Sequence, residues 1–293
     1  MNIVDANEPR FVDPPDLVAR VEEIALIPAG ESLPDDAEQV VQRVLDALES
    51  GDVRSARKDA QGNWNAVHWV KRGILLAFRA GAVVDMSPTG SSLRFFDKRT
   101  IPPRDLTLAD GVRVVPGGSS IRRGAYVAPG VVCMPPMFVN AGAWVGQGTM
   151  VDSHALVGSC AQIGERVHLS AAAQIGGVLE PVNAAPVVIE DEVVVGGNCG
   201  VYEGTVVRAR AVLAAGTVLT RGTPVFDLVN ERILRGSAET PLEIPAGAVV
   251  VPGARAVSTG WGRDLGLSLQ TPIIVKYRDE RTDVSTALEA WLR

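Results

Sequence analysis

The chain has 293 residues and a formal net charge of −6, with 28 Lys and Arg against 34 Asp and Glu. This acidic balance argues against a general nucleic-acid binder, because such proteins present a basic face to the phosphates. No apolar stretch approaches the roughly 20 residues of a membrane helix, and the first residues lack the features of a signal peptide. Aromatic residues make up only 5% of the chain, so its core must be built from small and β-branched aliphatic side chains. We therefore expect a cytoplasmic protein without a membrane partner.

Residues 1–110 are predicted to form a helical domain. Residues 35–50 carry aliphatic side chains at helical spacing, and Gly51 follows as a stop. Residues 65–80 give a second amphipathic helix that ends before Gly81. Turn-rich segments with several prolines lie between and after these two helices.

A six-residue repeat dominates residues 111–253. From Val115 to Ile175, eleven successive positions at intervals of six hold ten aliphatic residues and one cysteine. The repeat resumes at Ile189 and, after a second break, at Ile244. Six residues make one short strand and one corner, whereas helices and hairpin sheets repeat at other intervals. The pattern therefore predicts a parallel β-helix, whose stacked coils bury a continuous aliphatic column.

Two interruptions and a C-terminal extension complete the predicted organisation. Loops over residues 176–188 and 225–243 leave the coil, and loops of this length in a compact repeat are commonly functional. Residues 254–293 are predicted as an extension that contains a strand at residues 272–277 and a short helix at residues 283–292.

The cysteines and histidines indicate neither a metal site nor a cysteine nucleophile. Cys133 and Cys199 fall on inward or small-residue positions and Cys160 on a corner, so we interpret all three as structural. Their odd number and their spacing favour a reducing compartment. His154 and His168 are the histidines of the repeat, too few for a three-histidine metal site, and we expect no metal.

Asp152 directly follows an inward-pointing valine, so its carboxylate should point out of the coil. A carboxylate on an apolar wall can act as a general base, although a solvated turn aspartate is the plainer alternative. His154, two residues later, is a second candidate base. Glu203, and Glu180 in the first loop, also lie outside the inward column. Arg113, at the start of the repeat, is suited to gripping a substrate carboxylate through a bidentate pair.

Several motifs are longer than the six-residue rule requires. Residues 150–181 contain MVD, VGSCAQIG, VHLS and IGGVLEP in that order. They resemble the tetrahydrodipicolinate N-succinyltransferases, a family of hexapeptide-repeat acyltransferases. The similarity extends to residues 62–79 of the helical part, to RFFDK at residues 94–98 and to RVVP at residues 113–116. It covers roughly residues 36–280.

The resemblance implies a left-handed parallel β-helix and a homotrimer with sites between subunits. It implies that succinyl-CoA, a co-substrate rather than a permanently bound cofactor, donates its acyl group to the amino group of tetrahydrodipicolinate. The acceptor is the ring-opened form, L-2-amino-6-oxopimelate, on the route to diaminopimelate and lysine. By position, Arg113 would bind a substrate carboxylate, and Asp152 would orient or deprotonate the acceptor amine. Lys276 is predicted to contact the phosphates of CoA.

Two positions depart from the family pattern. Gly200 stands where some members carry a glutamate that reaches across the subunit boundary, so either Glu203 takes over as a catalytic residue or the contact is dispensable. His154 stands where the family has an aromatic residue, so it is not an inherited base, although it can still influence Asp152. Three alternatives stay open: acetyl transfer to the same acceptor, acyl transfer to an amino sugar, and a non-catalytic β-helix scaffold.

Overall fold

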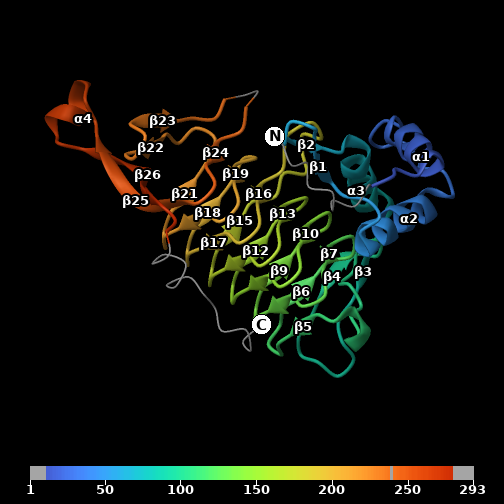
Figure 1. The fold of residues 1–293 in the computed structure, drawn as a ribbon. Coiled ribbons are helices and arrows are strands. Elements are labelled where there is room, and N and C mark those ends of the chain that lie inside the picture. Colours follow the sequence, from blue (N-terminus) through green and yellow to red (C-terminus); the bar gives the residue numbers. More distant parts are fainter. Residues whose placement is uncertain (1–10, 238–239, 280–293) are drawn as a thin grey trace.

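The computed structural model describes residues 11–237 and 240–279 of the chain. Figure 1 shows a helical region packed against one side of a long coil of short strands, with a hairpin beyond the far end of the coil. The helix predicted over residues 283–292 lies outside the described residues.

The N-terminal region is helical, as predicted. Its helices are α1 (Pro15–Ala25), α2 (Ala37–Ser50) and α3 (His68–Ala80), followed by the 3-10 helix η1 (Leu108–Asp110). Helices α2 and α3 confirm the two predicted helices. Helix α1 was not among the predicted helices. Its buried Leu17, Val21 and Ile24 follow helical spacing, but prolines at its start make this spacing hard to recognise in the sequence. The first residues of the second predicted helix form a strand instead, β2 (Trp64–Ala66), paired antiparallel with β1 (Ala56–Lys58). A second small hairpin joins β3 (Val83–Asp85) to β4 (Phe96–Lys98).

Helices α2 and α3 pack closely because a glycine lies where they meet. A Cβ at Gly73 of α3 would stand 2.9 Å from a methyl carbon of Val44 on α2. Val44 and its neighbour Leu45 are fully buried, together with Ile74 from α3. The apolar faces of the three helices therefore close a small core of their own beside the coil.

The repeat forms three parallel sheets, which confirms the predicted β-helix. Each six-residue unit gives a two-residue strand, and every third strand falls in the same sheet, so that Val145 pairs with Ile163 three units later. The left-handed sense remains a prediction from the resemblance. We name each sheet by its first strand. The β6 sheet contains β6 (Ser120–Ile121), β9 (Phe138–Val139), β12 (Leu156–Val157), β15 (Gln174–Ile175), β18 (Gly200–Val201) and β21 (Val218–Leu219). The β7 sheet contains β7 (Tyr126–Val127), β10 (Trp144–Val145), β13 (Gln162–Ile163), β16 (Val188–Ile189), β19 (Val206–Val207) and β24 (Glu243–Ile244).

The β5 sheet is the longest and leaves the coil at its far end. Its coil strands are β5 (Arg113–Val114), β8 (Val132–Cys133), β11 (Met150–Val151), β14 (His168–Leu169), β17 (Val194–Val195) and β20 (Val212–Leu213). Beyond them lie β25 (Ala248–Ala256), β26 (Ser268–Tyr277), β22 (Val225–Asp227) and β23 (Arg232–Leu234). In all three sheets the second residue of each coil strand from Ile121 onward points inward and is buried, as the repeat predicts.

The start of the column differs from the prediction by one residue. Val114, and not Val115, pairs with Cys133 of the next coil. The segment between β5 and β6 therefore holds one residue more than the repeat requires. Gly117 and Gly118 lie in that segment with φ of 144° and 91°, and residues without a Cβ reach such angles without strain. The shift turns Arg113 into the outward residue of its strand.

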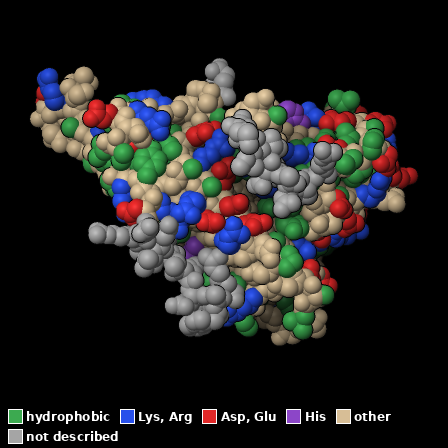
Figure 2. All heavy atoms as spheres, in the orientation of Figure 1, with side chains coloured by type: hydrophobic (Ala, Val, Ile, Leu, Met, Phe, Trp, Pro, Cys, Tyr) green, Lys and Arg blue, Asp and Glu red, His purple; other side chains and the backbone are tan. Residues whose placement is uncertain are grey.

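The two interruptions differ in kind. The loop between β15 and β16 has no strand of its own. The second interruption contains the hairpin β22–β23, and β22 also pairs with β26. Strand β26 is longer than the predicted strand over residues 272–277, and it pairs antiparallel with β25, with the short helix α4 (Gly260–Asp264) at the turn. Asp227 anchors the hairpin β22–β23: burial acts to raise its pKa, but hydrogen bonds from Asn230, Tyr277 and Arg232 hold the pKa at about 2. Figure 2 shows hydrophobic side chains gathered over this hairpin, where Leu228 and Ile233 are exposed.

The helical region is fastened to the β7 sheet by polar side chains. Gln162, an outward residue of that sheet, is fully buried and donates to the Ser55 hydroxyl at 2.8 Å. It also accepts a bond from Arg54, whose guanidinium lies 4.3 Å from the ring centroid of Trp144. Burial acts to raise the pKa of Glu190, but a hydrogen bond from Trp64 and nearby cationic charges lower it below its usual range. The β7 sheet is therefore covered by the chain's own N-terminal region.

Lys71 connects the helical region to the first loop. Its side chain is fully buried, and its Nζ donates to the carbonyl oxygens of Pro181 and Ala184 at 3.2 and 2.9 Å. Burial lowers the pKa of this amine. Because both acceptors belong to the loop between β15 and β16, α3 fixes the course of that loop over the coil.

Candidate active site

Asp152 lies on the outer face of the β5 sheet, directly after β11. Its backbone N–H donates to the Leu169 carbonyl at 2.9 Å, which continues the ladder into β14. One carboxylate oxygen, Oδ1, accepts the Ser153 N–H at 2.7 Å. The other, Oδ2, lies 4.0 Å from Nε2 of His168. The side chains of Asp152 and His168 are 30% and 18% exposed, so both are half-buried, and the Nε2 atom of His168 is itself buried.

The register of the β5 sheet places Arg113 on the same outer face. Arg113 pairs with Val132, which pairs with Met150, which pairs with His168. These residues form an outward row along the coil, and Asp152 stands beside the row two residues after Met150. Strands in a sheet lie about 4.8 Å apart. Arg113 is therefore two strand spacings, about 10 Å, from Met150, the residue of the row that stands beside Asp152. The structure thus brings the predicted carboxylate binder and the predicted base to one face.

Lys276 extends this row at its other end. Val194 pairs with Val212, Val212 with Val249, and Val249 with Lys276. Its Nζ lies 3.3 Å from the carboxylate of Asp279. Arg113 and Lys276 therefore mark the two ends of one face of the coil, with Asp152 and His168 between them.

Glu203 lies elsewhere. It follows β18 of the β6 sheet at a corner, with φ of 55°, and its Oε2 accepts the Arg221 N–H at 3.1 Å. It lines a cavity of about 650 Å³ together with Trp64, His68 and Arg221. Asp152 does not line this cavity, so the fold of one subunit does not bring the two predicted catalytic carboxylates together.

The position of Gly200 is occupied by a neighbouring ring. A Cβ at Gly200 would lie 2.4 Å from Cε2 of Tyr202, and a Cβ at Gly176, on the preceding coil, would lie 2.8 Å from Cδ1 of the same ring. The half-buried ring of Tyr202 therefore rests on two glycines in successive coils. In this chain the aromatic ring takes the space that a glutamate side chain at residue 200 would need.

The remaining candidates do not join Asp152 and His168 as reactive groups. His154 lies at the corner after Asp152 with φ of 63°, and its backbone N–H donates to the Pro136 carbonyl. Burial raises the pKa of the Cys133 thiol to about 12 and that of Cys160 to about 11. Such thiols are not nucleophiles near neutral pH. Cys160 is at a corner, as predicted, but it is buried against the helical region rather than facing solvent.

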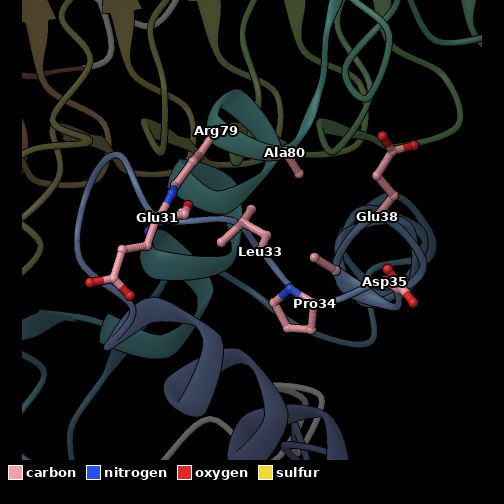
Figure 3. A pocket seen from close by; sticks show the side chains of 8 residues that line it. Glu31, Leu33, Pro34, Asp35, Glu38, Arg79 and Ala80 are labelled. Carbon is pink, nitrogen blue, oxygen red and sulfur yellow. The ribbon is translucent and has the colours of Figure 1, made fainter.

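A separate cavity lies within the helical region, away from these residues. Figure 3 shows it between α2 and the end of α3, lined by Glu31, Leu33 and Arg79 among others, with a volume of about 410 Å³. Arg79 donates to the carbonyl oxygens of Ile27, Pro28 and Glu31. Its guanidinium is thus engaged in holding the segment after α1, which gives it a structural role.

Within residues 11–237 and 240–279, no group of three or more His, Cys, Asp and Glu side chains is placed to hold a metal ion. In the same part of the chain, the helices are too short or too polar to span a bilayer.

Comparisons with known proteins relate both parts of the chain to one family. Residues 21–80 match the family model described as the N-terminal part of tetrahydrodipicolinate N-succinyltransferase, and residues 186–221 match the hexapeptide repeat of succinyl-transferase. Among solved structures, the chain is similar to a Campylobacter jejuni protein described as an N-succinyltransferase. That similarity has 17% identity and a TM-score of 0.49, and it covers 85% of this chain and 64% of the other.

Curated relatives align along most of their length. The 2,3,4,5-tetrahydropyridine-2,6-dicarboxylate N-succinyltransferase of Polynucleobacter asymbioticus is 39% identical over 269 residues, which cover 90% of this chain and 92% of the relative. The protein of the same name from Paramagnetospirillum magneticum is 41% identical over 264 residues, which cover 88% and 90%. With this identity over nearly the whole of both chains, and with the coil and the motifs described above, the chain belongs to the tetrahydrodipicolinate N-succinyltransferase family.

Proposed function

We propose that this protein transfers the succinyl group of succinyl-CoA to the amino group of ring-opened tetrahydrodipicolinate, a step of diaminopimelate and lysine biosynthesis. The names of its relatives support the acceptor and the donor. The observation that carries the proposal is the face of the β5 sheet on which Arg113 and Asp152 lie about two strand spacings apart. An acceptor with a carboxylate and an amine requires such a pair of groups.

In the proposed mechanism the free amine of the acceptor attacks the thioester carbonyl carbon of succinyl-CoA. The new C–N bond forms as the carbonyl becomes an oxyanion, which backbone N–H groups of the coil stabilise. Asp152 accepts the proton that the amine nitrogen loses. The C–S bond then breaks, the thiolate of CoA leaves, and it takes up a proton to give the free thiol. Arg113 holds an acceptor carboxylate, and Lys276 contacts the phosphates of CoA.

We also propose a homotrimer that works in the cytoplasm. The outward residues Phe138, Leu156 and Val218 of the β6 sheet are apolar and half-buried, while the β7 sheet is already covered by the helical region. A second copy is the natural cover for such a row. In that assembly Glu203 of one subunit is our candidate to complete the site of the next. Three buried free cysteines agree with a reducing compartment.

The first experiment is thiol release from succinyl-CoA and acetyl-CoA, measured side by side with L-2-aminopimelate as the acceptor analogue. We expect acceptor-dependent release from succinyl-CoA. Release from acetyl-CoA alone would support tetrahydrodipicolinate as the acceptor but make acetyl-CoA the donor. If neither donor releases thiol and CoA binding is normal, another acceptor is favoured. If CoA binding is lost as well, a non-catalytic scaffold is favoured.

Arg113→Ala tests the proposed contact between Arg113 and a carboxylate of the acceptor. We expect the acceptor KM to rise by about 10-fold or more, because a charged hydrogen-bond pair with a carboxylate contributes about 1.5–3 kcal/mol. The KM for succinyl-CoA should stay unchanged. Arg263→Ala, on the exposed α4 turn where Arg263 pairs with Asp264, is the matched control. An unaltered acceptor KM in Arg113→Ala would remove Arg113 from the site.

A further inference from the structure

We propose that His168 is a positioning residue for Asp152: its imidazole holds the carboxylate in the orientation that the acceptor amine requires. This inference rests on the proposed function, in which Asp152 is the base. His168 lies in the VHLS motif, which carries the family resemblance but assigns this residue no role. The assignment comes from the stacking of coils, which places residues of β11 and β14 side by side.

The geometry encloses the Asp152 carboxylate from two directions. Oδ1 accepts the Ser153 N–H at 2.7 Å, and Nε2 of His168 faces Oδ2 at 4.0 Å. The Asp152 N–H donates to Leu169, the residue after His168. Backbone bonds fix both residues, and the proposed role requires Nε2 and Oδ2 to close from 4.0 Å to hydrogen-bond distance when a ligand excludes water.

The neighbours of the imidazole make this contact electrostatically significant. In the outward row, His168 lies between Met150 and Val194, which are apolar. Asp152 is the carboxylate facing Nε2, and Arg113 lies three strands away in the same row. On the segment before His168, Glu165 and Arg166 pair with each other, and Arg166 also pairs with Glu192. Within the part of the chain that the structure describes, Asp152 is therefore a charged group that faces the imidazole.

The row also explains why a histidine suits this position. Most outward residues of the β5 sheet within the coil are aliphatic or, in Met150, a thioether, and none of these can donate a hydrogen bond. A histidine has a ring that packs between Met150 and Val194 and a nitrogen that reaches the carboxylate. A lysine would bring a mobile charge and no ring to pack.

The test compares His168→Leu with His168→Gln. Leucine removes the donor, and we expect kcat to fall by about 10–100-fold, the scale of a misplaced catalytic group. Glutamine places an amide N–H near the position of Nε2, so it should recover most of kcat. Val83→Thr, at an exposed position of β3 in the N-terminal region, is the control and should match the parent enzyme.

The outcomes separate this inference from the proposed function. Equal kcat values for the two variants would overturn the positioning role. If Asp152→Asn loses turnover while His168→Leu keeps it, the base stands and only His168 is discarded. If Asp152→Asn is fully active, Asp152 is not the base, and the inference about His168 is overturned as well. If His168→Leu does not fold, His168→Ala replaces it as the variant without a donor, with CoA binding and thermal unfolding as checks.

Discussion

Replacing Asp152 with asparagine should reduce kcat by about 100- to 10,000-fold, the range that a positioned general base contributes. The asparagine carbonyl can still accept the Ser153 N–H that Oδ1 accepts at 2.7 Å in the structure, so the local fold should persist. The amide cannot take a proton from the attacking amine. Thiol release with saturating succinyl-CoA and acceptor measures the loss, and CoA binding by calorimetry should remain normal.

The control for this variant is Asp264→Asn. Asp264 lies at the exposed end of α4 and pairs with Arg263, so its replacement should leave kcat unchanged. A second control is the molecular mass in solution, which should be the same for both variants and the parent. Near-parental turnover by Asp152→Asn would eliminate the carboxylate as the base and direct attention to Glu203.

Leu169→Ala should lower the free energy of unfolding by about 2–5 kcal/mol, the usual range for a buried leucine. Leu169 is fully buried in the inward column, where it pairs with Val151 below and Val195 above. Each coil contacts only its neighbours, so a cavity here weakens two interfaces between coils. The shift of the urea midpoint, measured at one protein concentration, reports the loss.

Leu108→Ala is the matched control for the coil. Leu108 lies on η1 and is 100% exposed, so the same truncation should change stability by less than about 0.5 kcal/mol. Equal midpoints for the two variants would mean that the column contributes no more than a surface residue, contrary to the account of the coil as the main core.

The repeat could be predicted because its cause is local. One inward aliphatic residue per strand is visible in the sequence, and the same residues are buried in the structure. The one-residue shift at Val114 could not be predicted, because Gly117 and Gly118 absorb the extra residue by backbone angles that the sequence permits but does not require. The packing of the helical region against the β7 sheet could not be predicted either. Gln162 is a polar residue at an outward position, and its burial depends on contacts with Ser55 and Arg54.

Part of the geometry of the candidate site could be predicted, while the roles of its residues stay predictions. Arg113 and Asp152 come to one face, whereas Glu203 belongs to another face of the same subunit. His168 was not predicted as a neighbour of Asp152, although a signal existed. Three units of six residues return the chain to the same sheet, so residues about one coil apart in the sequence are neighbours in space. Applying that interval to Asp152 points to the segment that contains His168.

The arm formed by β25 and β26 has a consequence for how copies of this chain meet. A coil of parallel strands ends in rows of unpaired backbone groups, and each end resembles the next rung to be added. At one end β25 pairs antiparallel with β26, so the polypeptide reverses direction over the last rung of the β5 sheet. At the other end residues 103 and 122 form an antiparallel bridge beneath the first coil. Both reversals interrupt the pattern that would template another coil, and so they oppose end-to-end growth into filaments.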